Sequence, residues 1–498
     1  MLNLRSFKQC SVWFMAAILT VVLPQCLQAE TPFTPLLNQV PDDANILVMI
    51  DSEQIRRSVF GKAVVADKSA GDENSHIVSG EERAQVLLAA RIRGFRNSMI
   101  DWQKALIKMN VEPSIAGLAA SYSGSVETLG KRDYAVLPYG AVAVSTDRNV
   151  LAVLTPPDRQ QVSRAVQMVN AKKKAQLSSY MTSAAEQVGG AVGAIVAVDL
   201  NDMFSQSQIR SRLAGSETFR NPPIDVGVAA SFLASIKGLV LQLAFRKDAQ
   251  ATLTVDFSQE PPEMSKWGKE LIIEILSNNG AYFEDIDNWT FTQGKNKIVL
   301  EGPISISGIR QVLSLIDFPT EVPSQYQPGA VLTSEQEQQR TAKATLTRFR
   351  ATQKLVADLR KDDRARTGRI GESAMWFDRY ARQIETLPSL YVDPDMLQYC
   401  DDVVMRLRVQ STHYRMASSR INQQSAQQNQ QNVDFWGNFN NFYGDTYNTW
   451  TRQESDFART RRFERAGSAS NRAEQFQAID EDTVAIRRKM VEKYKVEF

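Results

Sequence analysis

The sequence predicts an α+β protein in which β-hairpins, each followed by a helix, form antiparallel sheet covered by helices, with an all-α region at the C-terminus. Three observations support this prediction. Apolar and polar residues alternate through residues 237–257, helical stripes follow such hairpins at three- and four-residue spacing, and strand patterns stop beyond Ser334. Whether the hairpins join into one sheet or two stays open at this stage.

The clearest unit is Lys237–Ser277. The large apolar residues of Leu239–Phe245 fall on one face, and residues 252–257 resume the alternation after a short polar gap. Pro261 and Pro262 suit the first turn of a helix, where no N–H is needed. The apolar stripe that follows can cover the buried face of the hairpin.

The same order recurs in two other stretches, Ala141–Val169 and Trp289–Ile316. A second similarity pairs Asn45–Asp51 with Ala194–Asp199, each an apolar strand that ends in Asp. We therefore expect an α+β domain over residues 30–317, with an internal duplication relating residues 30–178 to 190–317.

Two further elements complete this domain. Ser79 and Glu82 have the spacing of a capping box, and Pro113 ends the apolar pattern that follows. Together they predict a helix that begins at the capping box and ends before Pro113. Its apolar stripe, in steps of four and three, is Leu88, Ile92, Phe95, Met99, Trp102, Leu106 and Met109. Ile115–Ser121 is expected to be a strand, and Asp225–Ser235 a helix.

The first 29 residues have the pattern of a secretory signal peptide. Arg5 and Lys8 precede the apolar run Val12–Leu23, and Ala29 is a small residue at a cleavage point. Cleavage would leave 56 basic and 56 acidic residues, so no overall field would steer the mature protein onto nucleic acid or acidic membrane. No later stretch is long and apolar enough to span a bilayer.

Cysteine usage agrees with export into the cell envelope. Cys400 is the one cysteine outside the signal peptide, so an internal disulfide cannot form and the fold must rely on its core. We expect an exported protein of the periplasm or cell envelope.

The C-terminal part is predicted as a Pro-rich linker over residues 318–333, a helical region over 334–421, and a terminal charged helix within 451–498. Asp393 and Pro394 form the start signal of the third helix in the helical region. Between these parts, residues 422–450 are rich in Gln, Asn and aromatic residues, a composition typical of a disordered or adhesive segment.

Two stretches resemble a group of uncharacterised exported proteins of planctomycete bacteria. They are the opening PDDANILVMID at Pro41–Asp51 and the block Ala374–Val404, with a Trp-bearing helix, an LPSLYVDP turn and an amphipathic helix. The resemblance implies an envelope of the Gram-negative type. It implies no activity.

Catalytic groups are scarce. The two histidines, His76 and His413, belong to no zinc or nucleophile motif, and no phosphate-binding glycine loop occurs. Asp51 and Asp199 end matching strands and are the catalytic candidates, since two carboxylates at suitable distance hydrolyse glycosides. The alternative is that each caps the helix behind it. No metal or cofactor is expected.

The sequence therefore favours a non-catalytic envelope protein that binds or scaffolds, with an envelope protein or polysaccharide as its partner and self-association through the tail helices as an option. A carboxylate-dependent hydrolase is one alternative. The other is a glycan-binding surface protein that uses the tail aromatics Trp436, Tyr443 and Trp450.

Overall fold

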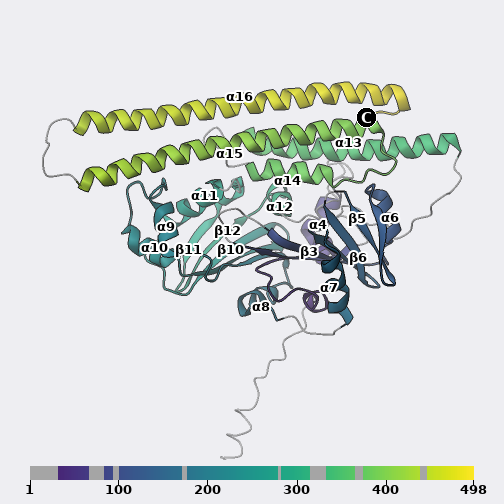
Figure 1. Cartoon of the computed structure of the whole chain (residues 1–498), viewed down its shortest axis with the longest axis horizontal. Coiled ribbons are helices and arrows are strands. Elements are labelled where there is room, and N and C mark those ends of the chain that lie inside the picture. The colour runs from purple at the N-terminus through teal and green to yellow at the C-terminus, as the bar shows by residue number, and fades with distance from the viewer. Residues whose placement is uncertain are drawn as a thin grey trace, which may run out of the picture.

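The computed structural model describes residues 32–66, 83–93, 100–138, 140–170, 176–278, 282–313, 333–364, 374–437 and 446–498. All strands of these ranges belong to one sheet, in the order β11-β12-β10-β9-β8-β1-β2-β3-β7-β6-β5-β4. The named pairs are all antiparallel. Figure 1 shows the sheet with α7 and α8 on one side and the long C-terminal helices on the other. The predicted α+β class is confirmed, and the hairpins form a single sheet.

The centre of the sheet consists of β8 (Val192–Asp199), β1 (Ile46–Asp51), β2 (Arg83–Ile92) and β3 (Ile100–Met109). Val86 and Leu88 pack into the core on one face of β2, while Leu87 and Ala89 pack into the core on the other. A strand buried on both faces needs apolar residues at nearly every position.

The helix predicted between Ser79 and Pro113 is therefore wrong where the structure describes this stretch. β2 and β3 pair with each other through Leu87 and Leu106. Without polar alternation, the apolar residues of two buried strands fell at helix-like spacing by coincidence.

One half of the sheet continues from β8 into the hairpin of the Lys237–Ser277 unit. Its strands are β9 (Ile236–Phe245), β10 (Ala249–Phe257), β12 (Lys297–Pro303) and β11 (Thr290–Gln293). Its helices are α9 (Gln206–Leu213), α10 (Val226–Leu233), α11 (Gly268–Asn278), the 3-10 turn η3 (Glu284–Asn288) and α12 (Ile306–Leu313). Asp225 caps α10 by accepting a hydrogen bond from Val228 N, as the predicted helix start requires.

The other half continues from β3. Its strands are β7 (Val150–Thr155), β6 (Ala141–Asp147), β5 (Arg132–Leu137) and β4 (Ser125–Leu129), and α7 (Arg159–Asn170) follows β7. Ile115–Ser121, predicted as a strand, is the helix α6. The Ser114 hydroxyl caps it by accepting a hydrogen bond from Gly117 N, which favours a helix over an extended chain.

Short helices cover both faces of the sheet. The first face packs against residues of α3 (Ser52–Arg57), α6, η3 and α12, and α4 (Val59–Ala66) contributes the partly buried Phe60. The second face packs against α2 (Thr34–Leu37), α7 and α8 (Ser179–Ala185). Three strand–turn–strand–helix units are thus present, and their origin by duplication stays a prediction.

Where the structure describes the C-terminal region, it has four helices with their own core. They are α13 (Ser334–Arg364), α14 (Ala374–Glu385), α15 (Pro394–Gly437) and α16 (Thr446–Tyr494). The 44 residues of α15 and the 49 of α16 correspond to about 65 and 75 Å of helix. In Figure 1 these two helices run side by side along the long axis of the molecule. None of the described helices has the length and hydropathy to cross a membrane.

The two long helices overlap the predicted Gln/Asn/aromatic segment, residues 422–450. α15 continues to Gly437 and α16 starts at Thr446, so the Gln/Asn-rich stretch from residue 422 onward lies largely within two helices. Residues 438–445, most of the Pro-rich linker and the predicted signal peptide lie outside the described residues.

Candidate functional site

The two candidate carboxylates, Asp51 and Asp199, lie at opposite ends of neighbouring strands. β1 and β8 are antiparallel, with Ile46 opposite Val198, and Asp199 N donates to Asn45 O at 2.9 Å. Six residues of strand therefore separate the level of Asp199 from that of Asp51, which is about 20 Å. Glycoside hydrolysis needs its two carboxyl groups within about 10 Å. The predicted pair does not form.

Each of these carboxylates has a local structural partner instead. Asp51 Oδ1 accepts from Gln54 N at 2.8 Å and caps α3, as the alternative prediction proposed. Asp199 accepts from Ser178 Oγ at 2.5 Å and from Asn201 N at 3.1 Å, while Ser205 caps the following helix.

Tyr180 of α8 reaches across β9 to a carboxylate on β10. Tyr180 Oη donates to Asp256 Oδ2 at 2.9 Å, and burial followed by the charge of Asp256 raises the pKa of Tyr180. The ring crosses Gly238, where a Cβ would lie 2.3 Å from Tyr180 Cε1. The absence of a side chain at Gly238 thus leaves room for the Tyr180 ring, which attaches α8 to the sheet. The raised pKa keeps the phenol protonated, so it remains a hydrogen-bond donor.

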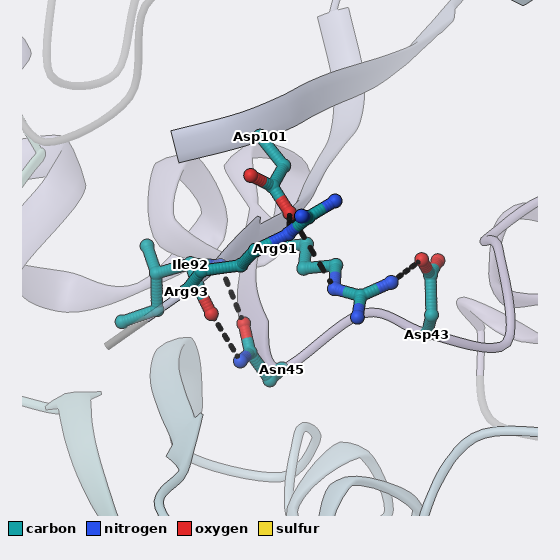
Figure 2. Close-up of polar contacts among 6 residues, drawn as sticks. All are labelled: Asp43, Asn45, Arg91, Ile92, Arg93 and Asp101. Atoms are coloured by element: carbon teal, nitrogen blue, oxygen red, sulfur yellow. Dashed lines mark hydrogen bonds and ion pairs between the residues drawn. The ribbon is translucent and has the colours of Figure 1, made fainter. Parts of the chain in front are cut away.

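The Pro41–Asp51 opening forms a polar clamp at one end of the central strands, shown in Figure 2. The Asn45 side chain exchanges two 2.9 Å hydrogen bonds with the backbone of Ile92, extending the β1–β2 ladder by one pair. Arg91 contacts Asp43 and Asp101, and Arg93 also contacts Asp101. These ion pairs are largely exposed, so the clamp aligns strands and adds little stability.

Lys104 on β3 is a buried base that the sequence did not single out. Its side chain is 3% exposed, its Nζ donates to Gln39 O at 2.7 Å, and Gln39 Oε1 accepts from Thr146 Oγ1 at 2.9 Å. Among the described residues no carboxylate pairs with it. Burial lowers the pKa of Lys104 to about 8. Because the side chain is buried, its amine is a structural group and is not presented to a substrate.

The LPSLYVDP turn between α14 and α15 is where the helices of the C-terminal region are linked by polar contacts. Arg348 of α13 is 6% exposed, and its guanidinium donates to Leu387 O at 2.6 Å, Pro388 O at 2.9 Å and Ile384 O at 3.2 Å. A fixed positive charge thus binds the carbonyls at and just beyond the end of α14.

Asp393 is the second anchor of this turn. It is 1% exposed, and Oδ1 accepts from Asp395 N at 2.9 Å, which confirms the predicted helix start. Oδ2 accepts from Lys493 Nζ and Tyr494 Oη of α16, each at 2.6 Å. Burial alone would raise the pKa of Asp393, but the hydrogen bonds from Lys493, Tyr494 and Asp395 outweigh it and lower the pKa.

The same turn attaches the helices to the sheet domain. Ser389 N and Leu390 N donate to Ser121 O at 2.8 and 3.2 Å. Two further contacts reinforce this attachment, from Arg310 to Asp358 at 2.7 Å and from Trp376 Nε1 to Tyr282 O at 2.7 Å. We name the residues Arg348, Ser389, Leu390 and Asp393 the polar junction.

Next to the junction, α15 has an exposed apolar face, which we name the outer face. Met405, Val409 and Met416 on it are 57%, 39% and 43% exposed. A groove of about 560 Å³ runs along it, with Glu385 of α14 at its edge. Its other lining residues, all on α15, are Asp401, Val404, Met405, Arg408, Val409, Thr412, His413 and Met416.

Cys400 and His413, which the structure describes, are not brought together in a reactive site. Cys400 is fully buried, with Sγ 3.4 Å from Thr352 Oγ1, so it is a core thiol. His413 lies 3.4 Å from Asn471 across the α15–α16 seam. In the described ranges no three His, Cys, Asp or Glu side chains gather as a metal site would require. His76 is outside the described residues.

The aromatic candidates remain a prediction. Trp436 is near the end of α15 and Trp450 near the start of α16, with Tyr443 in the stretch between these helices that is outside the described residues. The side chains of Trp436 and Trp450 are also outside the described set, so the glycan-binding hypothesis is not tested.

Comparisons with known proteins give little further information. No protein-family profile and no curated protein matches the chain. Two solved structures of TP0453, crystal forms I and III, each align with a TM-score of 0.34 and 12% sequence identity. They cover 56% of this chain and 97% and 98% of theirs. Similarity this weak transfers neither a fold nor a function.

Proposed function

We propose that this chain is an exported, non-catalytic protein of a Gram-negative-type cell envelope, similar to the exported planctomycete proteins, that acts by binding or scaffolding. The polar junction is the observation that carries the proposal. It joins four helices to one another and to α6 of the sheet domain through buried and partly buried hydrogen bonds, so the outer face of α15 is held in a fixed position relative to the sheet domain. A rigid, exposed apolar surface suits a binding protein.

The hydrolase alternative receives no support from its candidate pair. It rested on Asp51 and Asp199, which are about 20 Å apart along antiparallel strands. Asp51 is engaged as a helix cap and Asp199 in a turn. The non-catalytic proposal does not depend on either residue.

Export is tested first. The full chain, produced in a Gram-negative bacterium, should be recovered from the periplasmic or envelope fraction with Glu30 as its first residue. A Leu19→Arg variant, which interrupts the apolar run, should remain uncleaved in the cytoplasm. Recovery of the uncleaved wild-type chain from the cytoplasm would disprove the export part of the proposal.

Binding is tested on the exported protein. Immobilised protein should retain an envelope protein or polysaccharide at physiological salt, or should assemble with itself. Heat-unfolded protein on the same support serves as the control for nonspecific adsorption. A protein that stays monomeric and retains neither class of partner would contradict the scaffolding role.

A further inference from the structure

The outer face of α15 changes charge along its length. At 100° per residue, Asp401, Met405 and Arg408 lie within about 60° of one direction. Asp401 comes one turn before Met405, and Arg408 comes about one turn after it. Asp401 and Arg408 are seven residues apart and therefore occupy the same flank of the helix. The exposed face thus runs from negative, through an apolar centre, to positive.

The neighbouring helices leave this face open. On one flank, Arg408 reaches Glu385 of α14 at 2.6 Å. On the other, Arg406 reaches Asp482 of α16 at 2.9 Å. Between these flanks Met405 is 57% exposed. Asp401, on the same flank as Arg408, has no ion-pair partner among the described residues. The groove of the outer face follows this open strip of α15.

We propose that a second copy of this chain binds here, with the two α15 helices antiparallel about a twofold axis at Met405. Asp401 lies about 6 Å from Met405 along the helix, and Arg408 about 4.5 Å on the other side. An antiparallel copy therefore places its Arg408 opposite Asp401, and the symmetry forms this ion pair twice.

The chemistry of the face selects a copy of itself over another partner. Met405 meets Met405 at the axis, and Val409 packs beside it, so the apolar centre is buried by its own counterpart. The Arg408 guanidinium has five N–H donors, enough for Glu385 of its own chain and Asp401 of the second. An unrelated helix would need the reversed charge order by coincidence. The inference is independent of export.

Charge exchange tests the pairing. An Asp401→Arg variant would bring two guanidinium groups together at each pair, and an Arg408→Glu variant would bring two carboxylates together. Each variant alone should dimerise about tenfold or more weakly than the wild type. Mixed in equal amounts, they should form a heterodimer, because one ion pair is then native, the other is reversed, and both are attractive. The Arg408→Glu variant also carries Glu385→Gln, which prevents repulsion within the chain.

Substitution at the axis provides the matched control. Met405→Asp places two carboxylates in contact and should weaken the dimer by about a hundredfold. Val484→Asp on α16, at the same 57% exposure, should leave it unchanged. Sedimentation velocity of the full chain from about 1 to about 100 µM measures each dimer, and circular dichroism verifies folding.

The outcomes separate cleanly. Recovery of a dimer on mixing supports the proposal, because a folding defect in either variant could not be repaired by the other. A wild-type chain that is monomeric throughout this range overturns it. A dimer unaffected by Met405→Asp also overturns it, since the contact would then use another face.

Discussion

Two buried charged residues, Asp393 in the helical region and Lys104 in the sheet, have opposite surroundings. Asp393 is 1% exposed and accepts hydrogen bonds from an ammonium, a phenol and a backbone N–H. Lys104 is 3% exposed and donates to one backbone carbonyl, with no described carboxylate beside it. The pKa of each is lowered, for opposite reasons: hydrogen bonds favour the charged form of Asp393, and burial disfavours that of Lys104.

The two buried charges therefore have different structural roles. The Asp393 carboxylate joins the start of α15 to the end of α16 across 100 residues, so its charge fixes tertiary structure. Burying the charged amine of Lys104 in an otherwise apolar layer is unfavourable for folding. Its one hydrogen bond holds the segment after α2 against the sheet.

The largest effect is expected from Asp393→Ala. It removes the helix cap and two charge-assisted hydrogen bonds, and should lower the free energy of unfolding by about 3 kcal/mol. Asp395→Ala is the matched control. Asp395 is 40% exposed and pairs with Lys489, so its loss should cost less than about 1 kcal/mol. Urea unfolding measures both, and equal losses would show that Asp393 is no special anchor.

The pH dependence follows from the lowered pKa of Asp393. The unfolded chain binds this proton near the ordinary value of 3.8, and the folded chain binds it only at lower pH. The contribution is therefore complete above about 4 and is lost as the pH falls through the folded pKa. The difference in stability between wild type and Asp393→Ala should shrink on acidification below that pH.

Lys104→Met should have the opposite sign and a smaller effect. Methionine fills a similar volume without a charge, so the variant should be more stable at pH 7 by about 2 kcal/mol. Below pH 8 both states of the wild type bind the proton, and the full cost of burial applies. Between about 8 and 10.5 only the unfolded state does, so wild-type stability rises with pH.

The gain from Lys104→Met should therefore disappear as the pH is raised through this window. Lys108→Met on the same strand serves as the control, because Lys108 is only half-buried. Stability curves of the three proteins at pH 7, 9 and 10.5 measure the effect. A Lys104→Met variant that is less stable than the wild type at pH 7 would show that the Gln39 hydrogen bond outweighs the buried charge.

The fold was predictable where one side of an element is exposed. In β9 and β10 apolar and polar positions alternate, and the helices of the tail have narrow stripes, so the type of each element was correct. β2 and β3 are buried on both sides and lost this signal. α6 was missed because its small apolar residues suit a short strand equally well, and only the Ser114 cap distinguishes the two.

The sites were predictable only where the chemistry is local. The Asp393 cap was inferred from the Asp-Pro pair, whereas Lys493 and Tyr494 are about 100 residues away in sequence. Asp51 and Asp199 end similar strands, but their separation depends on the antiparallel pairing of β1 with β8. Strand order is a property of the whole chain, so residue patterns could not supply it.

A buried neutral residue, Gln410, is expected to have a smaller effect on stability than the two buried charges. Gln410 on α15 is 1% exposed, and neither its amide nitrogen nor its oxygen has a hydrogen-bond partner in the described structure. It follows Arg406 by four residues and precedes His413 by three, which places it on the side of α15 that faces α16.

Gln410→Leu should therefore stabilise the protein by about 1 kcal/mol, since burying an unpaired amide is unfavourable and leucine has a similar size. Gln477→Leu on α16, at an exposed position where the glutamine bonds only to Glu481, should change stability by less than about 0.5 kcal/mol. Thermal unfolding of the two variants measures the contrast. If Gln410→Leu destabilises the protein instead, the amide is hydrogen-bonded in solution. The buried polar groups between α15 and α16, charged and neutral, would then all be hydrogen-bonded, as Asp393 is.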